Sequence, residues 1–432
     1  MGKPASSDLS AEPASATGVT IGKYRWVVCA LLFFATTINY IDRQILALLK
    51  EVLDQQIGWT NEQFGWVNSA FQIAYGFGLL GFGWFVDRFG TKIGYAISIA
   101  AWSLAAAAHA FVGSIGGFLV ARSALGLGEG GNFPSAIKSV ANWFPKSERA
   151  FATSIFNSGT NAGALIAPAV VPWLAYHYGW KSAFIAAAIA GLIWLCFWLP
   201  FYEVPEKSRR VGEPELRYIQ SSAAESDVMA RPSWPTLLQY RQTWSFVLAK
   251  FLTDPVWWFY LYWLPPYLYD VRKFDLKQIG WALPVVYLMA DFGSVGGGWL
   301  SGYLIRRGWT TKRARRGAMT VCALCMPVAA LAVLAPGPVL TIALIGLANS
   351  AHQGWSANLF TITSDTFPRG AVASVTGIGG CAGGIGGFLF SAVIPGFVVS
   401  HFGYKPMFGL MGTIHVIALL AMFPLLKQKA AP

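Results

Sequence analysis

Twelve apolar segments, each long enough to cross a lipid bilayer, dominate this chain of 432 residues. A membrane-spanning helix needs about 20 mostly apolar residues, and spanning segments must satisfy their own backbone hydrogen bonds. Only 12% of the residues are charged, which excludes an ordinary soluble domain. The sequence therefore predicts an all-α membrane protein with twelve transmembrane helices, at residues 24–48, 61–86, 92–113, 116–143, 149–175, 181–202, 244–269, 278–305, 315–335, 338–365, 371–400 and 404–427.

The longest polar interruption divides these segments into two groups of six. We expect one six-helix bundle at residues 23–202 and another at 243–432, joined by a cytoplasmic loop at 203–242. Residues 1–22 are mostly small and polar, lack a cleavable signal pattern, and are expected to form a disordered cytoplasmic tail.

Lysine and arginine are concentrated in the loops on one side of the predicted membrane, including the cluster at residues 306–316. Cytoplasmic loops carry such an excess, so both chain termini are predicted to be cytoplasmic. The same asymmetry explains the net charge of +12 without a nucleic-acid partner. Membrane lipid is the expected surrounding.

The two groups of segments also repeat one another. Residues 177–184 (HYGWKSAF) match residues 401–408 (HFGYKPMF), and a Phe-Pro pair followed by a basic residue recurs at 144–146 and 367–369. Both matches occupy the same place in each group, which predicts two pseudo-symmetric bundles. Transporters built from such repeats place their binding site between them.

Four ionisable residues lie inside apolar segments of the first group: Asp42, Arg43, Arg122 and Glu129. A charge at the bilayer centre costs roughly 3 kcal/mol, so such residues usually face a bundle interior or an aqueous cavity. Arg122 and Glu129 are two helical turns apart on one face, and successive residues point about 100° apart. We therefore expect Arg43 to face the cavity while Asp42 turns toward the fourth helix and Arg122.

These residue types favour a proton-coupled anion site. Arginine binds a carboxylate bidentately and does not deprotonate in proteins, whereas a buried acid is able to carry a proton. Two alternatives stay open: the four charges form a network that only holds helices together, or Asp42 serves only as a salt-bridge partner for Arg43 or Arg122.

Other polar and aromatic residues share helix faces near the predicted cavity. From these faces we expect substrate contacts at Gln72, Tyr75, Asn157, Asn161, Trp263, His352, Gln353 and Ser356. Lys250 and Asp254 are spaced to pair with each other, and Asp291 has no evident partner. No metal site is expected, because Cys322-x-x-Cys325 lies inside an apolar segment without a second ligand pair.

The loop GWFVDRFGTK at residues 83–92 resembles the signature loop of the major facilitator superfamily, carried by Gly83, Asp87, Arg88, Gly90 and Lys92. This resemblance implies a gating role for the loop. A degraded copy without the acid follows at residues 302–308.

Further motifs make the chain similar to the anion:cation symporter family of that superfamily. They are NYIDRQ at 39–44, ARSALGLGEGGNFP at 121–134 and NWFPKSERA at 142–150. The segments at 250–271, 288–293 and 351–369 look most like the hexuronate branch. Members of that family take up sugar acids such as galacturonate, glucuronate or galactonate with protons.

The resemblance also implies roles for individual residues. Arg43 would bind the substrate carboxylate beside Tyr40 and Tyr75, Glu129 and Asp42 would carry protons, and Arg122 would be their charge partner. Related carriers place an asparagine of the eleventh helix near the substrate hydroxyls, where this chain has TGIGGCAGGIGGF at 376–388. A monomer in the bacterial inner membrane is expected, with the proton as coupling ion and no other cofactor.

Three competing functions remain on sequence grounds. The nearest is a carrier or exchanger of another organic anion, namely an aldonate, a dicarboxylate, an aromatic acid or a phosphate ester. A transporter-like receptor and a membrane-embedded enzyme are weaker alternatives, since no signalling domain, nucleophile or cofactor motif is present in the sequence.

Overall fold

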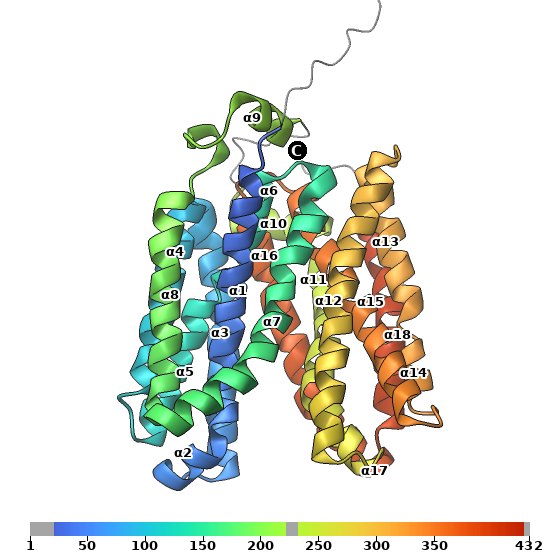
Figure 1. Ribbon diagram of the computed structural model, residues 1–432. Helices are drawn as coiled ribbons and strands as arrows, with labels where there is room; N and C mark the ends of the chain where they lie inside the picture. The colour runs from blue at the N-terminus through green and yellow to red at the C-terminus, as the bar shows by residue number, and fades with distance from the viewer. Residues whose placement is uncertain (1–20, 222–231, 427–432) are drawn as a thin grey trace, which may run out of the picture.

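The computed structural model describes residues 21–221 and 232–426, and every regular element in these ranges is helical. The helices form two groups side by side, blue to green and yellow to red in Figure 1. The first group contains α1 (Tyr24–Leu48), α2 (Lys50–Ile57), α3 (Asn61–Phe89), α4 (Thr91–His109), α5 (Ile115–Glu129), α6 (Asn132–Trp143), α7 (Lys146–Tyr178) and α8 (Lys181–Phe201). The second contains α11 (Arg241–Asp270), α12 (Leu276–Arg306), α13 (Thr311–Cys325), α14 (Val328–Ala332), α15 (Pro338–Thr366), α16 (Val372–Gly387), the π-helical η3 (Phe388–Val393), α17 (Ile394–Phe402) and α18 (Lys405–Leu426).

The predicted spanning segments correspond to these helices, and the twelve-helix architecture is confirmed. Within the described ranges, seven helices are both long and apolar enough to cross a membrane by length and composition. The remaining long helices include α7, α11 and α15, which contribute polar residues to the cavity described below. The predicted tail at residues 1–22 lies outside the described residues except for its last two.

Two predicted helices are interrupted. The segment 116–143 is divided at Gly130 and Gly131, where the backbone of Gly130 lies against Gly78 so closely that a Cβ atom would collide with it. The break therefore precedes Pro134, which sits in the first turn of α6, where a missing N–H group costs little. The segment 315–335 is divided at Met326 and Pro327 for the ordinary reason that proline cannot continue the hydrogen-bond ladder.

Glycines place equivalent helix pairs in close contact in both groups. α7 packs on α1, where Cβ atoms at Gly159 and Gly163 would lie 2.6 Å from the carbonyl oxygens of Phe33 and Thr37. In the second group α16 packs on α11 through Gly386, which abuts the backbone of Phe251. The repeated sequence thus produces the same helix pairing twice.

The segment between the bundles contains η1 (Pro205–Lys207), α9 (Glu213–Gln220) and α10 (Trp234–Gln239), where the sequence predicted a loop. Glu215 of α9 accepts hydrogen bonds from the backbone N–H groups of Tyr24 and Arg25 at the first turn of α1, at 3.2 and 3.1 Å. A capping carboxylate satisfies donors that a helix start leaves open. This contact fixes α9 to the end of the first bundle, at the top of Figure 1.

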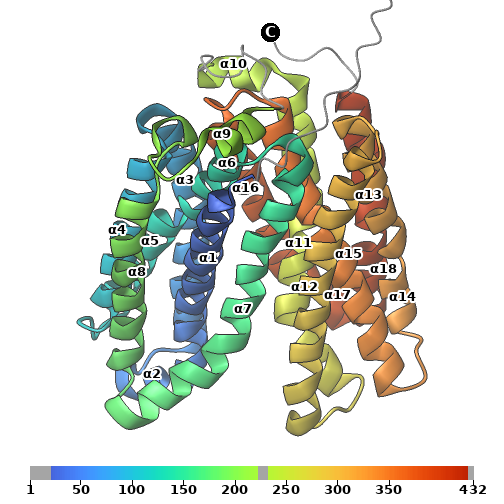
Figure 2. The same ribbon diagram turned by 45° about the horizontal axis from the view of Figure 1, so that its top comes forward.

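The two bundles meet through α7 beside α12 and α3 beside α16, as both ribbon views show (Figures 1 and 2). Cβ atoms at Gly298 and Gly302 of α12 would collide with α7 near Ala150 and Ser147. Gly377 of α16 lies equally close to α3. These contacts hold the bundles together toward the end of the molecule at which α9 lies.

Candidate functional site

A cavity lies between the two bundles, near the middle of their long helices. The first bundle lines it with Tyr40, Arg43, Gln72, Tyr75, Leu79, Phe133, Asn157 and Thr160. The second bundle lines it with Lys250, Asp254, Trp257, Trp258, His352, Gln353, Ser356, Phe360, Thr376, Gly380 and Gly384. This mixture of rings, amides, hydroxyls and charges is suited to a small polar ligand.

Arg43 is the cation on the first wall of the cavity. Its Nε donates to Oε2 of Glu129 at 2.6 Å, and Glu129 lies fully buried behind it. The rings of Tyr40 and Tyr75 contact the guanidinium, with centroids 4.8 and 4.4 Å from its central carbon. Such contacts hold a cation in place without neutralising it, and Arg43 lines the cavity.

Arg122 and Asp42 lie behind this pair. Arg122 donates from Nη2 to the backbone carbonyl of Arg43 at 3.1 Å, and its guanidinium carbon Cζ lies 4.8 Å from the ring centroid of Phe71. Both oxygens of Asp42 are buried, without a hydrogen-bond partner among the described residues. Glu129 pairs directly with Arg43. Arg122 forms no ion pair with Glu129 or Asp42 within the described ranges, but it interacts electrostatically with both acids.

The second wall carries its own ion pair. Lys250 Nζ lies 2.6 Å from Oδ2 of Asp254, which confirms the predicted pairing, and 4.0 Å from the ring centroid of Phe360. On α15, the Nδ1 atom of His352 lies 3.1 Å from Nε2 of His415, and its ring stacks parallel to Trp257. Each bundle thus has one cation–carboxylate pair at the cavity: Lys250 and Asp254 both line it, whereas in the first bundle Arg43 lines it and Glu129 lies behind.

Residues from both bundles close the cavity toward α9. The rings of Phe133 and Phe360 stack with centroids 5.2 Å apart, and Asn157 donates to Gln353 at 2.9 Å. Each contact joins the first bundle to the second. A ligand leaving toward α9 would have to separate them.

Asp87, which belongs to the motif at residues 83–92 and lies near the end of α3, joins the two bundles closer to the end of the molecule where α9 lies. Its carboxylate accepts from Lys138 Nζ at 2.8 Å and from the backbone N–H groups of Ser374 and Ala373 at 2.7 and 3.3 Å. The latter groups belong to the first turn of α16, where a negative charge is favourable. Gly83 lies against Ala373, so a side chain there would separate α3 from α16.

The other members of the motif loop contact the first bundle or solvent. Lys92 pairs with Glu203 at 3.0 Å near the surface. Burial raises the pKa of Glu203, but the hydrogen bonds from Lys92 and from the backbone N–H of Val204, with the charges of Lys92 and Lys207, together bring it below its usual value. Gly90 adopts φ +92° between α3 and α4, a conformation that favours glycine. Arg88 is exposed.

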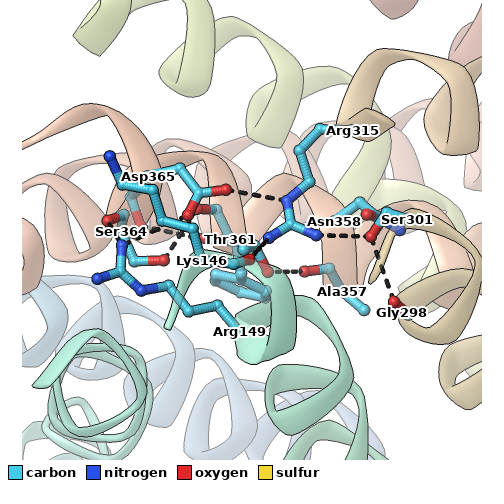
Figure 3. Close-up of polar contacts among 12 residues, drawn as sticks. Lys146, Arg149, Gly298, Ser301, Arg315, Ala357, Asn358, Thr361, Ser364 and Asp365 are labelled. Atoms are coloured by element: carbon cyan, nitrogen blue, oxygen red, sulfur yellow. Dashed lines mark hydrogen bonds and ion pairs between the residues drawn. The ribbon is translucent and has the colours of Figure 1, made fainter. Parts of the chain in front are cut away.

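A second inter-bundle network is formed by Arg149, Asp365 and Arg315 (Figure 3). Asp365 of α15 accepts from Arg315 Nε at 2.9 Å and pairs with Arg149 of α7 at 3.4 Å. Arg315 also donates to Ser301 and to the backbone carbonyl of Lys146, both at 2.6 Å. The sequence alone did not indicate this network, although Asp365 occupies the position of the internal repeat where the first half has Asn142.

Comparison with known families assigns this architecture. The family model described as Major Facilitator Superfamily matches residues 32–391. The chain belongs to the Major Facilitator Superfamily. It is consequently an integral membrane transporter and not an enzyme.

Proteins named as transporters resemble the chain over much or nearly all of its length. The hexuronate transporter of Escherichia coli K12 is 31% identical over 411 residues, covering 94% of this chain and 95% of that protein. The galacturonate transporter of Dickeya chrysanthemi is 31% identical over 279 residues, covering 64% and 81%. Among solved structures, the proton:xylose symporter XylE shares the superfamily fold with a TM-score of 0.76 at 16% identity, covering 93% and 95%.

Most of the predicted substrate residues of this superfamily member line the cavity. Two do not: Asn161 donates to Asp291 of α12 at 2.5 Å, and Trp263 packs edge-on against Tyr404. Asn161 thus supplies the partner of Asp291 that the sequence did not reveal. Lys250 and Asp254 line the cavity although the sequence indicated only their mutual pairing.

Replacing Asp87 by Asn is expected to weaken the contact between the two bundles at the end of the transporter where α9 lies, because the amide cannot neutralise Lys138. Breaking a buried ion pair costs about 3–5 kcal/mol. Spin labels at the exposed positions 88 and 307, with the native cysteines replaced by alanine, should report longer and broader distances by double electron–electron resonance. Asp54→Asn, in the surface pair with Lys50 on α2, is the control. An unchanged distribution in Asp87→Asn would contradict a closing role.

Proposed function

We propose that this transporter takes up an anionic sugar acid, of which galacturonate is the first candidate, together with protons by alternating access. The proposal depends on the pair of Arg43 and Glu129. Within the described ranges, Glu129 is the only acid that contacts Arg43, and it lies fully buried behind the arginine. Relatives named as hexuronate and galacturonate transporters support the substrate class.

The pair couples the substrate to the proton by competition for one guanidinium. While Glu129 is ionised it neutralises Arg43, and a second carboxylate gains little there. A proton on Glu129 removes that charge and leaves the planar guanidinium to bind the substrate carboxylate bidentately. The substrate therefore binds together with a proton, and loss of the proton returns Glu129 to Arg43 and releases the substrate.

Asp42 is the second proposed proton carrier. A buried carboxylate without a hydrogen-bond partner is costly in its charged form, and neither oxygen of Asp42 has such a partner among the described residues. Arg122 lies close enough to interact electrostatically with both acids. We propose that it compensates their charge when the protons leave.

The closed end with α9 is proposed to be the cytoplasmic one. The basic residues concentrated there, including those at 306–316, follow the positive-inside rule. The inter-bundle contacts of Asp87 and of Asp365 lie at this end. The described conformation then corresponds to a state whose cavity is shut off from the cytoplasm.

Uptake into proteoliposomes tests the proposal. When the medium outside the proteoliposomes is one pH unit more acidic than the lumen, labelled galacturonate should accumulate inside. A protonophore, which dissipates this pH gradient, should abolish the accumulation. Accumulation that is indifferent to the gradient would contradict proton coupling. Absence of galacturonate uptake, with uptake of a dicarboxylate or phosphate ester instead, would contradict the substrate class.

A further inference from the structure

The ion pair on the second wall has no role in the exchange between Arg43 and Glu129. Lys250 and Asp254 are one turn apart on α11 and both line the cavity. The side chain of Lys250 is 5% exposed, while that of Asp254 is 19% exposed. The carboxylate is therefore the more accessible half of the pair.

The glycine-rich face of α16 makes room for this carboxylate. A Cβ atom at Gly383 would collide with Oδ2 of Asp254, and Gly380 and Gly384 line the cavity beside it. The eleventh predicted span therefore offers little polar chemistry at this point. The polar group on this part of the wall comes from α11 instead.

Asp254 also faces the tyrosines of the first wall. Tyr40 and Tyr75, which contact Arg43 on the first wall, line the same cavity as Asp254 and interact electrostatically with it. A ligand whose carboxylate lies on Arg43 thus extends from a cation on one wall toward a carboxylate on the other.

We propose that Asp254, held by Lys250, binds the hydroxyl-bearing end of the sugar acid and excludes ligands with a second carboxylate there. This inference rests on the proposed function and deepens it. A sugar hydroxyl is able to donate to Asp254 and to accept from Lys250, so both partners of the pair remain satisfied. A second carboxylate only accepts, and it places a negative charge beside that of Asp254 in a site sheltered from water.

The pair thereby distinguishes a six-carbon monocarboxylate from the corresponding dicarboxylate. Arg43 binds the carboxylate that both ligands share, so it does not discriminate between them. Discrimination requires a group that meets the opposite end, and Asp254 is the accessible anion on the opposite wall.

Binding of galacturonate and galactarate to purified full-length protein in detergent, measured by isothermal titration calorimetry, tests the inference. In Asp254→Asn the ratio of the two dissociation constants should shift at least tenfold in favour of galactarate, because Lys250 is then free to bind the second carboxylate. Asp254→Glu should keep the wild-type preference, and so should Asp54→Asn in the surface pair on α2. A ratio in Asp254→Asn within twofold of wild type would overturn the inference.

A neutral double variant keeps the test valid if Asp254→Asn does not fold. Lys250→Gln with Asp254→Asn leaves no unpaired charge, and folding is checked by thermal unfolding. This variant should also lose the rejection of galactarate, and retention of the wild-type ratio would overturn the inference. If the wild-type protein binds no galacturonate, the proposed function fails. If it binds galacturonate and the ratio of the two dissociation constants is unchanged in the variants, only the role of Asp254 fails.

Discussion

Replacing Arg43 by Gln is expected to weaken galacturonate binding by about 100-fold or more and to abolish uptake. A hydrogen bond to a charged group contributes about 1.5–3 kcal/mol, and a bidentate carboxylate loses two of them. Arg43→Lys retains the charge but not the planar fork, so its affinity should lie between those of the wild type and Arg43→Gln. Calorimetric titration with galacturonate measures the binding, and proteoliposome uptake measures the transport.

A double variant separates ligand binding from charge balance. Arg43→Gln alone leaves Glu129 buried without its cation, and that defect by itself destabilises the protein. In Arg43→Gln with Glu129→Gln the site is neutral again, and the fold should recover in thermal unfolding while galacturonate binding does not. Recovery of binding in the double variant would show that Arg43 only neutralises Glu129.

Hydrophobicity and length were sufficient to predict the spanning helices. The first helix extends over residues 24–48, as predicted. Proline explains both interruptions. Pro134 cannot donate to the carbonyl of Gly130, and its ring clashes with that carbonyl, so the break at Gly130 and Gly131 lies one turn before it, whereas Pro327 lies at the second break itself. The packing of Gly130 on Gly78, by contrast, was not predictable, because Gly78 belongs to a different helix.

Helical periodicity predicted which residues face the cavity better than it predicted their partners. Arg43 and Glu129 are 86 residues apart, and no spacing rule connects residues on different helices. Lys250 and Asp254 are four residues apart on one helix, so their pairing was predictable. Their exposure to the cavity was not, because it depends on the space that Gly383 leaves on α16.

The same limitation explains why two of the predicted substrate residues, Asn161 and Trp263, do not line this cavity. Asn161 shares a helix face with Asn157, and periodicity alone therefore assigned both to the ligand. In the fold Asn157 reaches Gln353 beside the cavity, whereas Asn161 reaches Asp291 on α12. Both contacts join the bundles, but one helical turn along α7 separates a residue that also lines the cavity, Asn157, from one that does not, Asn161.

Replacing Glu129 by Gln should separate substrate movement from the proton gradient. The amide oxygen still accepts a hydrogen bond from Arg43, so the guanidinium keeps its place, but the side chain no longer exchanges a proton. If one proton accompanies each monoanion, a gradient of one pH unit supports about tenfold accumulation in the wild type. The variant should reach a ratio of about one, while exchange of external for internal galacturonate continues.

Asp42→Asn, measured in the same proteoliposomes, decides whether the second acid shares the proton. Both acids are buried and lie near Arg122, but only Glu129 contacts Arg43. If Glu129 alone couples transport, Asp42→Asn keeps the wild-type gradient-driven accumulation; if each acid carries a proton, Asp42→Asn accumulates less galacturonate than the wild type but still responds to the gradient. Gradient-driven accumulation by Glu129→Gln at the wild-type level would show that competition for Arg43 is not the coupling step.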